Sequence, residues 1–430
     1  MLDIRFIRDN TDLIRANLKL RRDKDKLKDF ERLLEMDEKI RVLMREIQDQ
    51  RTRRNKLSKE IGELKKSGQD SSKLEKQVNK VNDEIKSLES EKDAIQANLN
   101  RIQMSIPNIL HESVPFGKDE EDNVVVREWG GKPNFDFQYH SHVDLIETLG
   151  VGDIPRAAKI AGSRFYYLKN ELVLLDIAMQ QMALEMLLKK GYTPIYPPFM
   201  MRRTPYEGVT DLADFEDVMY KIEGEDLYLI ATSEHPISAM YMGEVFEPND
   251  LPIKLAGVSA CFRKEAGSHG KDTKGIFRVH QFNKVEQYVF SHPDESWKIH
   301  EELIKNEEEY VQALKLPYRI VNVCTGDIGI VAAKKLDLEF WFPGQQKYRE
   351  AGSCSNCTAY QATRLNIKYR LKKGGTEKAY LHTLNSTMMA NPRTMVAILE
   401  NYQREDGSVK IPSALLKYLP SDVKEIAPQN

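Results

Sequence analysis

The sequence is poor in cysteine and has no long hydrophobic run. Its 430 residues include only Cys261, Cys324, Cys354 and Cys357, which excludes a disulfide scaffold and suits a reducing cytoplasm. The mean hydropathy is −0.54, and no apolar run reaches the ~18 residues of a membrane-spanning helix. The first residues include acidic side chains and no apolar core, so we expect neither a secretory signal nor a transit peptide. These features predict a cytoplasmic protein without a membrane partner.

The usual glycine-rich nucleotide loops are also missing from the sequence. No G-x-x-x-x-G-K-[ST] motif is present, and no G-x-G-x-x-G follows a strand-like run. Any bound nucleotide must therefore be held by side chains on a sheet.

Charge, by contrast, is abundant and unevenly distributed. Charged residues make up 30% of the chain, above the usual ~25%. Residues 1–110 hold 26 basic and 21 acidic side chains, whereas the remainder holds 38 and 45. A basic N-terminal part fits a nucleic-acid-binding arm, and equally a charged helix surface with a small imbalance.

Two stretches of the N-terminal part keep a heptad pattern. Eight of ten seam positions are apolar in residues 33–64, and eight of nine are apolar in residues 74–102. A breaker cluster at 67–72 separates the stretches, and Pro107 should stop the second helix. The pattern predicts a projecting antiparallel coiled-coil hairpin roughly 50 Å long, because each narrow seam must be buried against the other.

The densest basic cluster of the chain lies inside this hairpin. It consists of Arg51, Arg53, Arg54 and Lys56. One interpretation is contact with nucleic-acid phosphates. The other is solvated charge, with Arg54 paired to an acidic residue such as Glu84 across the seam, and the pattern alone favours this second interpretation slightly.

From about residue 111 the chain alternates short β-rich runs with helical ones. Residues 171–190 read as a helix, and strand-like runs outnumber the helices between them. This order predicts an α+β fold, an antiparallel sheet flanked by helices. The strand-like runs are Asp226–Ala231, Lys254–Arg263, Gly275–Phe290, Tyr318–Val323, Glu339–Tyr348 and Tyr380–Asn385.

Residues 262–286 form the strongest candidate site. Arg263 ends one strand-like run, and Arg278, Phe282 and Glu286 follow on the next, four residues apart and so on one face. A cation, an aromatic plate and a carboxylate match a phosphate, a base and an amine. A hairpin with a charged turn and an edge ion pair is the alternative, which the pattern alone favours.

This stretch resembles motif 2 of the class II aminoacyl-tRNA synthetases, in the form carried by seryl-tRNA synthetases. Residues 191–198, which end at Pro198, resemble motif 1, and residues 385–400 resemble motif 3. Residues 232–234 are similar to the TxE loop of the family, and residues 348–358 match a further segment of it. The resemblance covers essentially the whole chain in order and is strongest to the archaeal branch.

The resemblance implies a two-step reaction on two domains. Serine would be activated with ATP to seryl-adenylate and then transferred to serine tRNA, with selenocysteine tRNA as a further expectation. An N-terminal tRNA-binding domain would span 1–110, with the coiled-coil arm at about 30–103, and a class II catalytic domain would span 111–430. The resemblance also implies a homodimer through the motif 1 region. The arm would grip the long variable arm of the tRNA and serve the active site of the other subunit.

The resemblance implies that three catalytic residues act on the reacting phosphates. Arg263 should bridge the α-phosphate and the serine carboxylate, and Arg393 should hold the γ-phosphate and cover the adenine. Glu350 and Ser353 should hold Mg²⁺, because hard oxygen ligands suit a hard cation. Arg263, Glu350 and Arg393 are therefore the expected catalytic residues. Pro392, which precedes Arg393, departs from the glycine-rich form of motif 3 in many members.

The same resemblance implies which residues bind the adenine. Phe282 should stack on the base, and Glu265 should read its exocyclic amine. Arg278 could face phosphate, although an ion pair at the strand edge is an equal alternative.

Serine recognition falls by resemblance to five further residues. Glu286, Asn385 and Thr387 should receive the hydroxyl, and Thr232 and Glu234 should receive the ammonium, with Arg263 on the carboxylate. A hydroxyl is best recognised by buried polar groups that stay unpaired without it.

The sequence argues against three other functions and against a structural zinc site. An amino acid:carrier-protein ligase of this family would lack the arm, a non-catalytic paralogue would have lost site residues, and a coiled-coil scaffold would not need the 320-residue body. Cys354-x-x-Cys357 resembles half of a zinc site, but a second cysteine pair is absent from the sequence, so we expect no structural zinc.

Overall fold

The structure is a computed structural model that describes residues 1–210, 218–265 and 274–428. The chain divides into two compact units, Met1–Pro107 and Asn108–Asn430. Each unit has its own buried core. The first contains four helices, α1 (Ile4–Asp9), α2 (Thr11–Leu20), α3 (Lys24–Lys66) and α4 (Ser72–Ser105).

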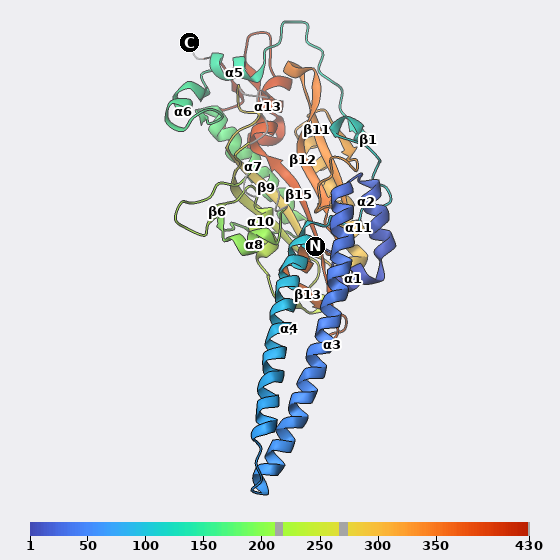
Figure 1. The fold of residues 1–430 in the computed structure, drawn as a ribbon. Coiled ribbons are helices and arrows are strands. Elements are labelled where there is room, and N and C mark those ends of the chain that lie inside the picture. Colours follow the sequence, from blue (N-terminus) through green and yellow to red (C-terminus); the bar gives the residue numbers. More distant parts are fainter. Residues whose placement is uncertain (211–217, 266–273, 429–430) are drawn as a thin grey trace. The chain divides into compact units, whose positions relative to one another are not determined.

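The two long helices of the first unit form the predicted coiled-coil hairpin (Figure 1). They run antiparallel around the turn at residues 67–71, and α4 ends two residues before Pro107. The heptad prediction is confirmed, since the seam side chains are the buried ones. They include Leu33, Ile40, Leu43, Ile47, Val81, Ile85, Leu99 and Ile102.

The base of the hairpin is fixed by a small apolar core and one buried carboxylate. Ile7, Ile14 and Phe30 are fully buried where α1 and α2 pack beside α3. Asp37 accepts two hydrogen bonds from the Arg8 guanidinium, at 2.8 and 2.7 Å. A bidentate pair of this kind fixes orientation as well as distance, so α1 is held in one position on α3.

The second unit is built on an eight-stranded sheet that is antiparallel except at one edge. The strand order is β1-β10-β11-β12-β15-β9-β8-β4, with only β4 parallel to its neighbour. This confirms the predicted α+β class. The strands are β1 (Val124–Trp129), β4 (Thr193–Ile195), β8 (Ile253–Phe262), β9 (Gln281–Ser291), β10 (Tyr318–Asn322), β11 (Lys334–Phe342), β12 (Lys347–Asn356) and β15 (His382–Ala390).

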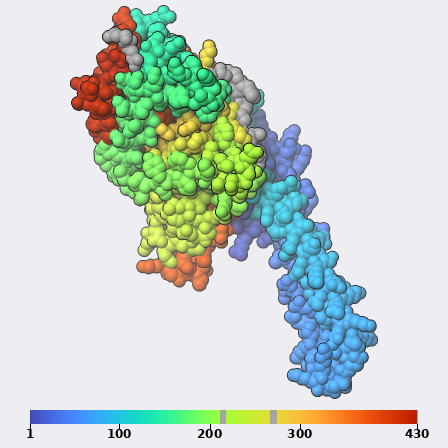
Figure 2. All heavy atoms as spheres, turned by 90° about the vertical axis from the view of Figure 1, so that its left-hand side faces the viewer, coloured from blue at the N-terminus to red at the C-terminus, as the bar shows by residue number. Residues whose placement is uncertain are grey.

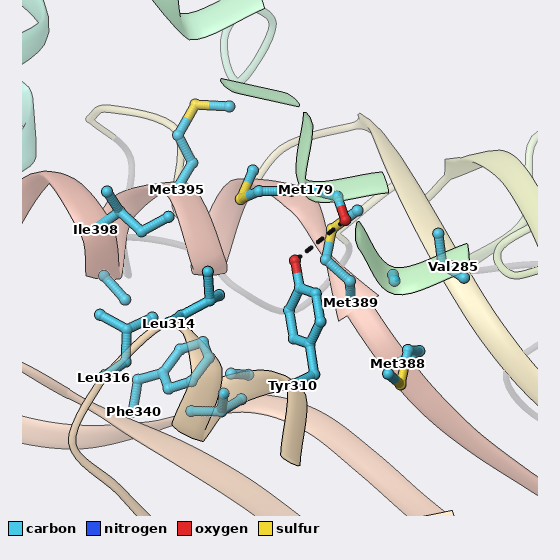
Figure 3. Close-up of a cluster of buried hydrophobic side chains, with 14 of the residues drawn as sticks. Met179, Val285, Tyr310, Leu314, Leu316, Phe340, Met388, Met389, Met395 and Ile398 are labelled. Carbon is cyan, nitrogen blue, oxygen red and sulfur yellow. Dashed lines mark hydrogen bonds between the residues drawn. The ribbon is translucent and has the colours of Figure 1, made fainter. Parts of the chain in front are cut away.

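One face of this sheet is covered by α7 (Glu171–Lys189), α11 (Ser296–Ala313) and α13 (Asn391–Asn401). Figure 3 shows side chains of all three helices meeting those of the strands in this core, with the Tyr310 hydroxyl donating to the Met179 carbonyl at 3.3 Å. Val285 and Val289 of β9 belong to the same cluster. The three helices therefore form a layer that packs against this face of the sheet.

The opposite face is covered at one end by three short helices, α8 (Arg203–Glu207), α10 (Glu234–Ala239) and α12 (Tyr360–Leu365). Tyr288 and Phe290 point into this second cluster, because successive side chains of a strand alternate between faces. The functional side chains described below lie on this same face.

Several predicted elements are confirmed and others need correction. The helix at 171–190 and the strand at Lys254–Arg263 match α7 and β8. The predicted strand Gly275–Phe290 is too long, since β9 begins at Gln281, so Arg278 lies in the preceding bend and not on the strand. The predicted strand Glu339–Tyr348 is wrong. There β11 ends at Phe342, and a 3₁₀ turn leads into β12.

Within the three described ranges, no helix combines the length and the apolar character needed to cross a bilayer.

Candidate active site

Strand alternation places a row of functional side chains on one face of the sheet. Phe282, Lys284 and Glu286 follow each other at two-residue spacing on β9 and therefore share a face. Thr387 of β15 lies directly opposite Glu286, and Asn385 is two residues further along the same strand. The register thus brings the predicted serine residues Glu286, Asn385 and Thr387 onto neighbouring positions.

A glycine on the other side of β9 makes room for the TxE loop. Gly257 of β8 is the register partner of Glu286. A Cβ atom at this position would lie 2.5 Å from Ile237 Cδ1 and 2.7 Å from Ser233 Oγ. The missing side chain therefore lets the start of α10 approach the strand, and it brings Thr232 and Glu234 over the sheet.

A β-bulge sets the positions of Glu350 and Ser353. On β12, Gly352 pairs with Leu338 while Glu350 pairs with Glu339, so Ala351 is an extra residue in the strand. Residues three apart normally point to opposite faces, and one extra residue reverses this. Glu350 and Ser353 consequently line the same cavity.

That cavity gathers most of the predicted nucleotide residues. Its lining comes from β9, β12, β15, the end of β8, the start of α13 and the bend before β9. The lining includes Arg263, Glu265, Phe277, Arg278, Phe282, Lys284, Glu350, Ser353, Thr387 and Arg393.

The remaining predicted residues make protein contacts beside the cavity. Gln361 Nε2 donates to Glu234 Oε1 at 3.0 Å, and the Glu234 amide donates to Thr232 Oγ1 at 3.2 Å. Asn385 is buried, with Nδ2 3.8 Å from the Cys357 sulfur.

Burial raises the pKa of both carboxyls near the floor of the site. For Glu234, burial and then the nearby Glu286 carboxylate raise the pKa to about 7, although Lys284 and Gln361 oppose this. Burial also raises the pKa of Glu286, against the opposing charges of Lys284 and Arg263. The Lys284 ammonium lies 2.5 Å from Glu286 Oε2, in a pair that is almost fully buried. Such carboxyls favour a cationic ligand, since a nearby positive charge stabilises their ionised form.

The opposite wall of the cavity is cationic and aromatic. Arg393 Nη1 donates to the Glu350 carbonyl at 2.7 Å and lies 3.4 Å from Glu350 Oε2. The Arg393 guanidinium sits 5.2 Å from the centre of the Phe277 ring, and Arg263 sits 5.2 Å from that of Phe282. Arg349 is not part of the lining, but its guanidinium also lies 4.5 Å from the centre of the Phe277 ring. The aromatic rings hold the guanidiniums in place by cation–π attraction.

The charge of Glu350 follows from this wall. Burial would raise the pKa of its carboxyl, but Arg393, Lys335 and Arg263 together lower it below the usual value. Half of the Glu350 side chain nevertheless remains exposed. An ionised, accessible carboxylate is thus present at the edge of the cavity.

The structure also gives Glu265 and Arg278 a partner. Arg278 Nη1 lies 3.5 Å from Glu265 Oε2, in agreement with the ion-pair alternative. Glu265 has a φ of +52°, a left-handed conformation that few residues other than glycine adopt. Both side chains still line the cavity.

Lys284 and Phe277 are among the lining residues that the sequence analysis does not predict. Lys284 stands two residues before Glu286, so strand alternation could have found it. Phe277 lies in the bend before β9, where no regular spacing indicates which way a side chain points.

The two cysteines of the C-x-x-C sequence contact different parts of the fold. Cys354 lies with its sulfur 3.6 Å from the His300 carbonyl, whereas Cys357 contacts Asn385. Both are buried and free. Over the described ranges, no group of three or more His, Cys, Asp or Glu side chains is arranged to hold a metal ion.

The basic cluster of the arm is only partly engaged. Arg51 Nη2 pairs with Glu89 Oε1 of the facing helix at 2.6 Å. Arg54 contacts the neighbouring Asn55 rather than Glu84, which was the partner considered from the sequence. Arg53 and Lys56 are exposed.

Comparison with known proteins agrees with the fold. Residues 218–402 match the class II tRNA synthetase core domain (G, H, P, S and T), and residues 1–110 match the seryl-tRNA synthetase N-terminal domain. The fold and the site thus define a class II aminoacyl-tRNA synthetase.

Individual relatives narrow this class. The serine–tRNA ligase of Methanocella arvoryzae is 54% identical over 97% of this chain and 99% of its own length. That of Thermococcus onnurineus is 50% identical over 100% and 97%. The crystal structure of seryl-tRNA synthetase from Pyrococcus horikoshii complexed with ATP superposes with a TM-score of 0.95, at 48% identity and full coverage of both chains. The chain belongs to the serine–tRNA ligase family.

Proposed function

We propose that the protein activates serine with ATP and transfers the seryl group to serine tRNA. The observation that carries this proposal is the buried Glu286, which lies opposite Thr387 and beside a cavity lined by arginines. Serine presents an ammonium, a carboxylate and a hydroxyl. The site offers carboxyls, guanidiniums and buried hydrogen-bonding groups in neighbouring positions.

Serine recognition is assigned to the buried side of the site. Glu286, Thr387 and Asn385 receive the hydroxyl, and Thr232 and Glu234 receive the ammonium. Alanine and glycine would leave these buried polar groups without a partner, which is the strongest way to reject an analogue that lacks a hydroxyl.

ATP is assigned to the cationic wall. Arg263 bridges the α-phosphate and the serine carboxylate, and a guanidinium fork suits such paired oxygens. Arg393 holds the γ-phosphate and covers the adenine, whose other face stacks on Phe282. Glu265 reads the exocyclic amine, and Arg278 stays near the phosphates from its pair with Glu265.

A magnesium ion fits beside these phosphates. Glu350 offers an ionised, half-exposed carboxylate and Ser353 a hydroxyl, and the bulge at Ala351 turns both toward one cavity. Oxygen ligands of this kind are those that Mg²⁺ takes together with substrate phosphates. When bound, the ion would neutralise phosphate charge.

The chemistry itself needs no nucleophile from the protein. A serine carboxylate oxygen attacks the α-phosphorus and pyrophosphate leaves. A ribose hydroxyl of the terminal tRNA adenosine then attacks the seryl carbonyl and AMP leaves. Arg263 and Arg393 contribute by orienting the reactants and offsetting charge, which is how most phosphoryl transfer is catalysed.

A homodimer is part of the proposal. Val173, Ile177 and Leu188 are exposed on α7 at spacings that repeat along one side of the helix, and Tyr196 after β4 is 76% exposed. The green atoms in Figure 2 show that the part of the chain around residues 150–200 forms a broad surface of the second unit. Exposed apolar side chains at an edge strand are typical of an interface between copies.

The arm completes the proposal. We assign tRNA binding to residues 1–110, with the arm at about 30–103, and catalysis to residues 111–430. Arg51, Arg53, Arg54 and Lys56 contact the backbone of the long variable arm, in the tRNA whose end enters the active site of the partner subunit. A helical hairpin can grip such a shape without reading bases.

Amino-acid-dependent ATP–pyrophosphate exchange tests the proposal without tRNA. Exchange with serine alone, among all twenty amino acids, is the expected result. Exchange with another small amino acid would point to a specialised ligase instead. No exchange at all would favour a non-catalytic paralogue.

A further inference from the structure

A fully buried carboxylate near the end of α13 joins three segments of the second unit. Glu400 Oε1 accepts from the His142 amide at 3.1 Å and lies 2.9 Å from His142 Nδ1. Glu400 Oε2 accepts from the Gly344 amide at 2.9 Å. His142 begins α5 (His142–Thr148), and Gly344 is in the turn between β11 and β12. None of these residues lines the cavity described above.

Glu400 shares a helix face with Arg393. The two residues are seven apart, which is two turns of α13. Arg393 binds Glu350 on β12, while Glu400 binds the turn that connects β11 to β12. The helix is therefore fastened to the same hairpin at two points, one of them inside the site and the other outside it.

The His142 ring supports a third segment. Gly275 has a φ of +75°, and a Cβ atom there would lie 2.2 Å from His142 Nε2. The backbone at Gly275 therefore packs directly on the ring. Two residues later comes Phe277, the ring against which Arg393 and Arg349 are placed.

We propose that Glu400 and His142 are positioning residues that hold Arg393, Glu350 and Phe277 in the arrangement that binds ATP. They touch no substrate in this proposal, which rests on the proposed function. Their hydrogen bonds join α13, α5 and the turn before β12, whereas Thr232, Glu234 and Asn385 lie on other segments, so we expect the effect on the phosphate side. Placement errors of about 1 Å in such a constellation cost roughly 100-fold in rate.

The ring chemistry of His142 offers a sharp test. Only Nδ1 has a hydrogen-bonding role toward Glu400, and Nε2 has no hydrogen-bond partner within the described part of the chain. Asn places its amide nitrogen near the position of Nδ1, whereas Gln extends it toward that of Nε2. His142→Asn should therefore preserve the contact to Glu400, and His142→Gln should lose it.

The experiment compares these variants and Glu400→Gln by ATP–pyrophosphate exchange in the full chain. Gln at 400 keeps only one accepting oxygen, so it cannot accept from both the His142 and the Gly344 backbone amides. We expect His142→Gln and Glu400→Gln to raise the KM for ATP about tenfold or more and to change the KM for serine less than about twofold. His142→Asn should stay near the wild type.

A matched control separates positioning from general loss of stability. Ser296→Ala removes the hydroxyl that lies 2.8 Å from His382 Nδ1, a contact of the same kind away from the cavity. It should lower the Tm without a split between the two KM values. Equal rises of both KM values in the Gln variants, or equal behaviour of His142→Asn and His142→Gln, would overturn the inference. Serine-dependent exchange by the wild type tests the proposed function independently.

Discussion

Two ion pairs of nearly the same length stand in opposite surroundings in the two units. In the second unit, Lys284 and Glu286 lie 2.5 Å apart with side chains only 7% and 1% exposed. In the arm, Arg51 and Glu89 lie 2.6 Å apart but are 49% and 36% exposed. Breaking a buried pair leaves an uncompensated charge and typically costs about 3–5 kcal/mol, whereas an exposed pair contributes about 0.2–1 kcal/mol.

The difference separates what each unit can do with charge. Buried groups such as those of the second unit can discriminate strongly between ligands, because an unmade contact cannot be replaced by water. Exposed groups on the arm give weak, salt-sensitive attraction that adds up over many contacts. On the proposed function, selecting an amino acid and holding an RNA by its shape therefore require different surroundings for the same residue types.

The largest expected effect comes from removing the buried carboxylate. Glu286→Ala should lower kcat/KM for serine by about 10⁴-fold, since the hydroxyl loses its partner. The KM for ATP should change far less. Titrating serine and ATP separately in the exchange assay measures both, and equal losses would place Glu286 outside the serine pocket.

A second variant separates the contribution of Glu286 to serine recognition from its contribution to stability. Glu286→Ala alone should also lower the free energy of unfolding by about 3–5 kcal/mol, because Lys284 stays buried without its partner. Lys284→Met added to it should restore part of the stability measured in urea, but none of the serine recognition. Recovery of both would mean that the pair acts only on folding.

The cationic wall should give the next largest effect. Arg393→Ala should reduce the rate of exchange about 10²–10³-fold, as expected when one preorganised charge contact to the transition state is lost. Arg349→Ala is the matched control, because Arg349 lies against the same Phe277 ring but is not among the residues that line the cavity. A comparable loss in both variants would contradict the role given to Arg393.

The same contrast explains how far the sequence could predict this structure. The arm follows from local spacing, since a seven-residue repeat of apolar positions in one helix is enough to require a partner. In the sheet, β8 and β10 could also be predicted from local sequence, because short runs rich in strand-forming residues indicate a strand. The start of β9 could not be predicted, because residues 275–279 have a strand-like composition yet lie in a run of bends before Gln281.

β-Bulges explain which side-chain positions of the site could not be predicted from the sequence. Glu350 and Ser353 share a cavity only because Ala351 is an extra residue relative to β11. On β15, Met388 is likewise the extra residue between Thr387 and Met389. Register shifts depend on the partner strand, so no local pattern reveals them, and resemblance to a family supplied these assignments instead.

Acidity should distinguish the two sides of the site by a smaller factor. Burial raises the pKa of Glu234 to about 7, so its carboxyl takes up a proton as the pH falls through 7. The KM for serine should then rise by up to about tenfold per pH unit, since an ammonium needs the ionised form. The KM for ATP should show no such rise. Glu234→Gln should weaken serine binding and flatten this pH dependence, and an unchanged profile would assign the titration to another group.

The smallest effect is expected on the arm, where it tests the exposed half of the comparison. Arg53→Ala with Lys56→Ala should weaken tRNA binding a few-fold and lower the slope of log K against log salt by about one to two. Pyrophosphate exchange should be unchanged. Arg51→Ala should weaken tRNA binding less than Arg53→Ala or Lys56→Ala, because Arg51 already has Glu89 as a partner. Glu89→Ala releases that arginine and should strengthen binding slightly, as measured by filter binding across a salt series. If Glu89→Ala instead weakened binding, the Arg51–Glu89 pair would be needed to hold the two helices in place for the RNA, and the arm would depend on fixed geometry as the site of the second unit does.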